Sequence, residues 1–156
     1  DFVAIVNEVP VSGGGAGITY YAIPDGAATT KVSAPLFKDN YYDSTSGLQI
    51  QNVGSAAASN IVATFSCTNE DGTAAFTAIS QPQSAAVGSS VQFFLPSQPG
   101  TGKPAFTAAN PFSAGEKNCS VTVDSDQAVV AIVNEMGCGP NLGIDDNNYE
   151  GFNLAP

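Results

Sequence analysis

The hexapeptide Val-Ala-Ile-Val-Asn-Glu occurs twice in this chain, and the repeat constrains the fold more than any other feature. One copy covers residues 3–8 and the other covers residues 130–135. A run of β-branched and small apolar residues that ends at Asn-Glu is typical of a β-strand entering a turn. The copies lie about one extracellular β-sandwich domain apart. A module with two copies of one strand has one more than its own sheet needs.

Glycine-rich stretches follow both copies. Residues 13–17 contain four glycines and precede Tyr20 and Tyr21, while residues 137–143 contain three and precede Tyr149. The chain therefore resembles one period of a repeat with an overlap of the next. Two interpretations remain open: tandem duplication, in which the chain belongs to an array of modules, and donation of the first copy to a neighbouring subunit.

The composition predicts one all-β domain. The chain has 156 residues, 43% of them hydrophobic and only 12% charged, with 16 glycines and 10 prolines. Turn residues are frequent and no long amphipathic helix is visible. We expect residues 1–17 to form a donor-strand arm with a glycine-rich hinge. Residues 18–156 would form the domain, with an acidic C-terminal tail.

The charge excludes several classes of partner. The formal net charge is −10, with no histidine and only four basic residues. Nucleic acids and anionic lipid surfaces both select basic proteins, so neither is expected as a partner. No apolar stretch reaches the ~18 residues that a membrane helix requires. The chain begins at Asp1 without methionine, and we expect that a leader was removed or that the chain is an excerpt.

Short segments with alternating or β-branched patterns predict an immunoglobulin-like antiparallel β-sandwich. The expected strands are residues 18–23, 29–37, 48–53, 60–67, 73–80, 90–95, 118–124 and 128–135. The expected core consists of Leu48, Ile50, Ile61, Phe65, Phe93, Val121, Val123, Val130 and Ile132. We expect Phe106 and Phe112 to pin the long irregular stretch 97–115 against the domain.

The three cysteines predict a disulfide in an oxidising compartment. Cys67 lies near the end of one expected strand and Cys119 near the start of another. Antiparallel neighbours would bring these ends together, so Cys67–Cys119 is the preferred pair. Cys119–Cys138 is the rival pair, and three free thiols are the remaining alternative.

No arrangement of residues indicates an enzyme or a resident cofactor. The chain lacks histidine to act as a base, and it has no Gly-x-Ser-x-Gly nucleophile elbow. The oxygen-rich tail holds a weak calcium candidate in Asp145, Asp146 and Glu150, although the EF-hand spacing is absent. The lysines also raise the question of a Lys–Asn isopeptide bond. That bond needs a buried lysine, an asparagine and an acid together, and the sequence alone does not bring them together.

Residues 41–54, read with residues 128–135, resemble immunoglobulin-like repeat modules of bacterial secreted surface proteins. The likeness covers about residues 35–136. It implies a structural or adhesive role without catalytic residues. The N-terminal arm is similar to the donor strands of pilins and matrix-fibre subunits only in its expected action, the donation of a strand to a neighbouring subunit.

Together these features predict a structural subunit of an extracellular or cell-surface filament that assembles head-to-tail with copies of itself. The expected assembly residues are Phe2, Val3, Ala4, Ile5, Val6 and Val9. The alternative is a monomeric adhesion or carbohydrate-binding module that contacts a host surface or a glycan. Its expected contact platform consists of Tyr20, Tyr21, Tyr41 and Tyr42.

Overall fold

All regular structure in the described part of the protein is β-strand. The computed structural model describes residues 5–8, 18–21, 23–24, 26–69, 71–94, 105–107, 112, 117–137 and 147–154. The strands are β1 (Ile5–Glu8), β2 (Ile18–Tyr21), β3 (Thr29–Asp39), β4 (Ser44–Asn52), β5 (Ala58–Asn69), β6 (Phe76–Ile79), β7 (Gln83–Ala85), β8 (Ser90–Phe94), β9 (Lys117–Gly137), β10 (Asn147–Glu150) and β11 (Phe152–Asn153).

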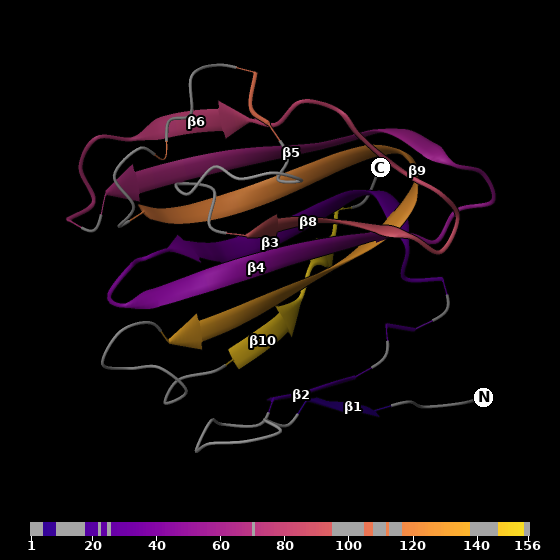
Figure 1. The fold of residues 1–156 in the computed structure, drawn as a ribbon, viewed down its shortest axis with the longest axis horizontal. Coiled ribbons are helices and arrows are strands. Elements are labelled where there is room, and N and C mark those ends of the chain that lie inside the picture. The colour runs from indigo at the N-terminus through magenta and orange to yellow at the C-terminus, as the bar shows by residue number, and fades with distance from the viewer. Residues whose placement is uncertain are drawn as a thin grey trace.

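Nine strands belong to one hydrogen-bonded sheet (Figure 1). Its main path runs β11-β3-β9-β4-β8, with β10 also paired to β9, and with β5 joining β9 to β6 and β7. Strands β1 and β2 form a separate two-stranded sheet. Every pairing among the described strands is antiparallel.

Strand β9 is the centre of the sheet. It has 21 residues, and a straight strand of that length would span roughly 70 Å. Its first half lies between β3 and β5, and its second half lies between β4 and β10. Figure 1 shows how strongly it bends between the two halves, so that one strand serves both parts of the sheet.

The bend in β9 is held by the start of β5 and by the loop that precedes it. The Asp126 carboxylate accepts hydrogen bonds from the Ser59 hydroxyl at 2.7 Å and from the Ser59 and Asn60 amides. These bonds, the Ser59 hydroxyl foremost, lower the pKa of Asp126. A Cβ added at Gly54 would lie 2.8 Å from the Gln127 side-chain oxygen. The loop therefore lies close against the bend at Gly54, and a larger residue there would displace the Gln127 side chain.

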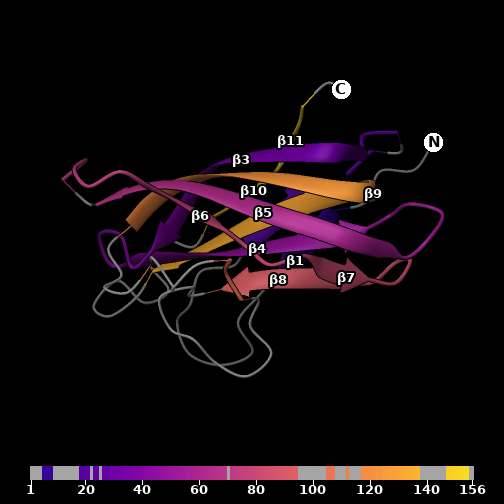
Figure 2. The same cartoon turned by 90° about the horizontal axis from the view of Figure 1, so that it is seen from above.

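The prediction of an all-β antiparallel protein is confirmed. The sheet curls strongly into a half-barrel, with β3 and the first half of β9 lying across from β4 and β8 (Figure 2). The immunoglobulin-like sandwich is not shown, because β9 joins both sides in one sheet. The described residues include no helix long and apolar enough to cross a membrane.

Aromatic rings fill the inside of the curl. Phe65 lies at the centre and packs edge-to-face at centroid distances of 5.2–5.9 Å. Its ring partners are Phe37, Phe93, Phe106 and Phe112. The expectation that Phe106 and Phe112 pin the long stretch before β9 is confirmed, since both pack on the core and Phe112 is fully buried.

Most of the predicted core is buried. The confirmed positions are Leu48, Ile50, Ile61, Phe65, Phe93, Val121 and Val123. The prediction for Val130 and Ile132 is wrong, because Val129, Ala131 and Val133 point inward instead. The sequence around Asp126 resembles a turn between two strands. Strand β9 instead continues through it, so the inward alternation set by Cys119 and Val121 persists to Gly137.

Several predicted bounds also change. The predicted strand at residues 73–80 is shorter and covers only β6, whereas the predicted loop at residues 81–88 contains β7. The polar tail contains β10 and β11. The sequence gives little sign of these short strands, because most of their residues are polar and their length allows no clear alternation.

Candidate functional site

The N-terminal copy of the repeat lies in a hairpin outside the nine-stranded sheet. Strand β1 pairs with β2 in the register Ile5↔Tyr21, Val6↔Tyr20, Asn7↔Thr19 and Glu8↔Ile18. Of the predicted assembly residues, Ile5 and Val6 are in β1, whereas Phe2, Val3, Ala4 and Val9 lie outside the described residues. The predicted hinge at residues 13–17 also lies outside them.

The second copy lies in a hairpin that belongs to the main sheet. The last part of β9 pairs with β10 in the register Ile132↔Glu150, Val133↔Tyr149, Asn134↔Asn148 and Glu135↔Asn147. On its other side, the same part of β9 pairs with β4, where Leu48 is opposite Val133. The second copy is therefore an interior strand of the sheet.

The two hairpins have the same pairing register. In each, the Ile-Val-Asn-Glu segment is paired in full with a single following strand, and the valine is opposite a tyrosine: Val6 opposite Tyr20, and Val133 opposite Tyr149. The connecting segments have similar lengths, residues 9–17 and 136–146. The sequence repeat therefore extends from one strand to a whole hairpin. In the sequence, the tyrosine after each glycine-rich stretch indicates that the second strand of the hairpin is also repeated.

The C-terminal hairpin closes a gap in the main sheet. The Gly151 amide donates to the Ala131 carbonyl at 2.8 Å, and the Leu154 amide donates to the Lys31 carbonyl at 3.1 Å. The segment formed by β10 and β11 thus bonds to β9 on one side and to β3 on the other. A Cβ at Gly151 would lie 2.5 Å from a Val32 methyl group, so this crossing depends on glycine.

Tyr149 anchors the hairpin to β3. Its hydroxyl donates to the Leu36 carbonyl and accepts from the Leu36 amide at 3.0 Å. Burial raises the pKa of Tyr149 to about 12, and the negative charge of Glu135 acts in the same direction. The tyrosine therefore stays neutral and bonded at every physiological pH.

The glutamate that ends the second copy forms a buried ion pair. Glu135 is 6% exposed, and its carboxylate lies 2.5 Å from the Lys38 ammonium. Lys38 comes from β3, so the pair joins the strands on both sides of the gap that β10 and β11 fill. Removing one partner would leave a charge buried without its counter-ion. Glu8 is the equivalent residue in the N-terminal hairpin.

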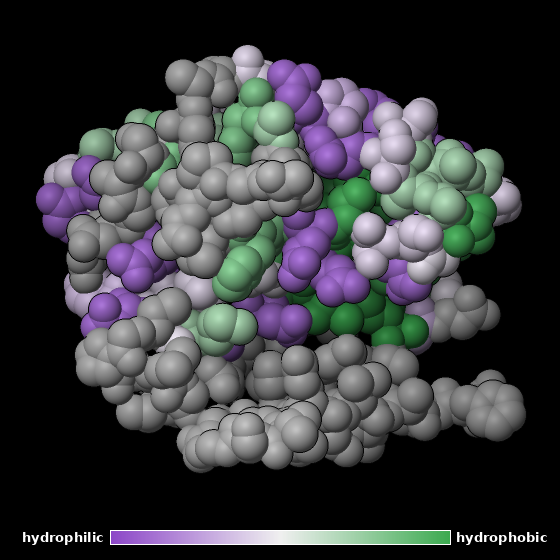
Figure 3. All heavy atoms as spheres, viewed as in Figure 1, coloured by the Kyte–Doolittle hydropathy of each residue, from purple (hydrophilic) through white to green (hydrophobic). Residues whose placement is uncertain are grey.

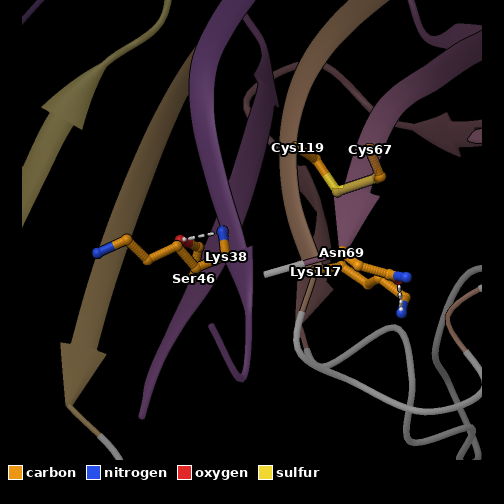
Figure 4. Close-up of a disulfide and its surroundings, with 6 residues drawn as sticks. All are labelled: Lys38, Ser46, Cys67, Asn69, Lys117 and Cys119. Carbon is orange, nitrogen blue, oxygen red and sulfur yellow. Dashed lines mark hydrogen bonds between the residues drawn. A yellow bond between two sulfur atoms is a disulfide. The ribbon is translucent and has the colours of Figure 1, made fainter. Parts of the chain in front are cut away.

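The preferred disulfide is present. Cys67 on β5 and Cys119 on β9 are direct cross-strand partners and are bonded to each other (Figure 4). Both strands present these residues to the inside of the curl, as their alternation predicts. Cys138, the member of the rival pair, lies outside the described residues.

The structure brings together no predicted metal ligands. Asp145 and Asp146 lie outside the described residues, and only the backbone of Glu150 is described, in β10. Within the described ranges, no cluster of three or more cysteine or acidic residues is placed to hold a metal ion. The calcium site stays a prediction.

The predicted tyrosine platform is described only in part. The rings of Tyr41 and Tyr42 meet edge-to-face with centroids 4.7 Å apart, and Tyr42 is 65% exposed. Tyr20 and Tyr21 lie in β2, and only their backbone is described. Among the described residues, the structure therefore places one aromatic pair at the turn between β3 and β4, with Tyr42 exposed and Tyr41 half-buried.

A shallow hollow lies on the outer face of β8, β4 and β9. Figure 3 shows apolar side chains there between polar ones. The volume is about 180 Å³, and the lining residues are Gln49, Gln51, Ser90, Val130, Ile132 and Asn134. Pockets for drug-sized ligands usually enclose at least ~300 Å³, so the hollow is small for an organic ligand. The second copy is therefore apolar on both faces of the sheet, with Val130 and Ile132 on the outer face and Ala131 and Val133 on the inner face.

Comparison with known proteins does not assign this chain to a family. No protein-family model matches it, and no match was found among curated proteins. A Thermotoga maritima protein of known structure, titled "Crystal Structure of Thermotoga maritima 1070", is similar with a TM-score of 0.45 at 18% identity. The similarity covers 83% of this chain and 96% of that chain.

Proposed function

We propose that the protein is a structural subunit of an extracellular filament or surface array, whose copies join head-to-tail through exchanged β-strands. One observation carries the proposal. The hairpin of β1 and β2 pairs with none of the nine strands of the main sheet, yet it has the register of the hairpin that completes that sheet.

The energetics of a two-stranded hairpin support strand exchange. In the described structure β2 lies against β10 but does not pair with it, so the hairpin has no third hydrogen-bonded strand. An isolated two-stranded hairpin is only marginally stable in water, and stability needs a third strand or a packed face. The strand Ile5–Glu8 has the sequence of a strand that is interior in the main sheet. Adding it to a neighbour's sheet would satisfy backbone groups and bury apolar side chains, each contributing about 1.5–3 kcal/mol.

Strand β8 is the acceptor that we propose. Among the strands of the described part, β8 bonds only to β4, so no described strand is paired with its other edge, where a third strand could add. The edge of β6 is less accessible, because the Thr107 amide donates to the Ile79 carbonyl there. A contact between an N-terminal hairpin and a different surface of the next copy is heterologous, and it builds an open filament when the rotation between copies does not close a ring.

The location outside the cell is part of the same proposal. The Cys67–Cys119 disulfide persists in oxidising compartments, and the low charge content matches a secreted β-protein. We also propose that the chain is an immunoglobulin-like repeat module. The alternative to strand exchange is tandem duplication, in which the N-terminal hairpin is the end of a preceding module.

Deleting residues 1–21 tests the assembly. We expect the full chain to form fibres or chains in negative-stain images and in light scattering. The truncated chain should stay monomeric, with an unchanged circular dichroism spectrum and thermal midpoint. Fibres from the truncated chain would contradict hairpin donation. If the full chain and the truncated chain are both monomeric, tandem duplication is favoured. If the truncated chain does not fold, the hairpin belongs to the domain of its own chain.

A cross-linking experiment tests the acceptor. One chain carries Asn7→Cys in β1 and a second carries Gln92→Cys in β8, both with Cys138→Ser. Mixing them under oxidation should give a covalent dimer that contains one chain of each kind. The matched control replaces Gln92→Cys by Ser66→Cys, an exposed position on β5, which is paired on both sides, to β6 and to β9. Equal cross-linking to both strands would refute β8 as the acceptor.

A second candidate function is adhesion to a glycan, and the exposed Tyr42 favours it. Aromatic rings held on a turn are a common surface for sugar faces. Binding of the monomeric truncated chain to a glycan array, lost in Tyr42→Ala and retained in Tyr42→Phe, would support this role. No binding to any arrayed glycan would count against it.

A further inference from the structure

Three polar residues form one row across β3, β9 and β5. Lys117 on β9 is the direct partner of Asp39 on β3 and of Asn69 on β5. Direct partners in antiparallel strands present their side chains to the same face. The row therefore brings together a lysine, an asparagine and an acid from segments far apart in the sequence.

The row lies on the inner face of the curl. Asn69 and Lys117 are two residues from Cys67 and Cys119, so they share the face of the disulfide. Asp39 is two residues from the fully buried Phe37 and is itself fully buried. Lys117 and Asn69 are half-buried. Water therefore has restricted access to the row, and the carboxyl group of Asp39 within it is buried.

The lysine and asparagine side chains are already in contact. The Lys117 amine nitrogen lies 2.5 Å from the Asn69 amide oxygen, and Figure 4 shows the two side chains side by side. An ordinary hydrogen bond accounts for a contact of this kind. The same contact also holds the lysine nitrogen next to the side-chain carbonyl group of Asn69. Well-oriented intramolecular reactants reach effective concentrations of about 10⁵–10⁸ M.

We propose that Lys117 and Asn69 form an intramolecular isopeptide bond, with Asp39 as the residue that transfers protons. The Asp39 carboxylate accepts a proton from the lysine ammonium, and the neutral amine attacks the Asn69 side-chain carbonyl carbon. A C–N bond forms between the lysine nitrogen and that carbon. As the bond to the amide nitrogen breaks, this nitrogen takes up a second proton from the attacking nitrogen and the proton held by Asp39, and it leaves as ammonium; the Asp39 carboxylate is regenerated. No oxidant, metal or other reactant is required.

The bond would give the sheet a second covalent link between β5 and β9, beside the disulfide. The disulfide can be reduced, whereas an amide bond cannot. The inference does not depend on the proposed assembly, because it concerns residues of a single chain.

Intact mass under reducing and denaturing conditions tests the inference. Loss of ammonia predicts that the full chain is about 17 Da lighter than its sequence mass. The Lys117→Arg variant keeps the positive charge but cannot form the bond, so it should have its full sequence mass. The Lys38→Arg variant is the matched control and should keep the 17 Da deficit, because its partner is Glu135. A digest should contain one branched peptide joining residues 69 and 117.

Two results would overturn the inference. The first is a full chain at its sequence mass. The second is a mass deficit that persists in Lys117→Arg, because an asparagine that closes on its own backbone also loses ammonia without any lysine. Asp39→Asn should slow the reaction many-fold while the chain stays folded by circular dichroism. Formation at an unchanged rate in that variant would remove Asp39 from the mechanism.

Discussion

The effect of removing the disulfide depends on whether the Lys117–Asn69 bond exists, and this gives the most informative stability measurement. The disulfide joins residues 52 positions apart. In the chain-entropy treatment, a loop of that length contributes about 4 kcal/mol to the free energy of unfolding. In a Lys117→Arg background, where no isopeptide bond can form, Cys67→Ala with Cys119→Ala should lose that amount.

The isopeptide bond would reduce this loss. It already closes nearly the same loop, so the disulfide then closes only a small ring of about six residues, which contributes about 2 kcal/mol. The assay is urea unfolding of four chains: the parent, the cysteine-pair variant, Lys117→Arg and the combined variant. All carry Cys138→Ser. The coupling between the two changes should be about 2 kcal/mol.

Two outcomes would refute parts of this reasoning. A loss below about 1 kcal/mol in the Lys117→Arg background would show that loop entropy does not govern the contribution of this disulfide. Equal losses of about 4 kcal/mol in both backgrounds would show that no second link exists.

Three further changes test the packing described above. Phe65→Ala should lower the free energy of unfolding by about 3–5 kcal/mol, because it removes the central ring of the core, and urea unfolding measures this. Gly151→Ala should be destabilising because its Cβ would lie 2.5 Å from Val32, whereas Gly47→Ala meets only ordinary contacts and should be tolerated in the same thermal melts. The pKa of Tyr149 is raised from 10.0 to about 12, so its contribution to stability is complete below pH 10 and is lost as the pH rises through 12. Tyr149→Phe should weaken that alkaline loss of stability in pH-dependent unfolding.

Local alternation made much of the fold predictable. The side chains of Phe65 and Cys67 alternate with polar neighbours, and that pattern gave both the buried face of β5 and the position of the disulfide. The same argument identified Cys119 as the partner. These predictions succeed because one face of each strand is buried and its neighbour is fixed by the pairing.

Predictions failed where tertiary contacts override a local signal. Residues 125–127 have turn chemistry, yet hydrogen bonds from Ser59 and Asn60 hold them in a continuous strand. That continuity reverses the faces expected for Val130 and Ile132. The row of Asp39, Lys117 and Asn69 could not be foreseen either, because its members approach one another only when β3 and β5 pair with the same strand.

The long strand β9 also determines when the chain can fold during its synthesis. Strand β3 pairs only with β9 and β11 in the described structure, and both come late in the chain. Until residue 117 has emerged, β3 has no partner, and only pairs such as β4 with β8 or β5 with β6 can form. Such long-range pairing makes folding slow. The chain would therefore remain largely unfolded through most of its passage out of a ribosome or an export channel, and the sheet would assemble only when the last quarter arrives.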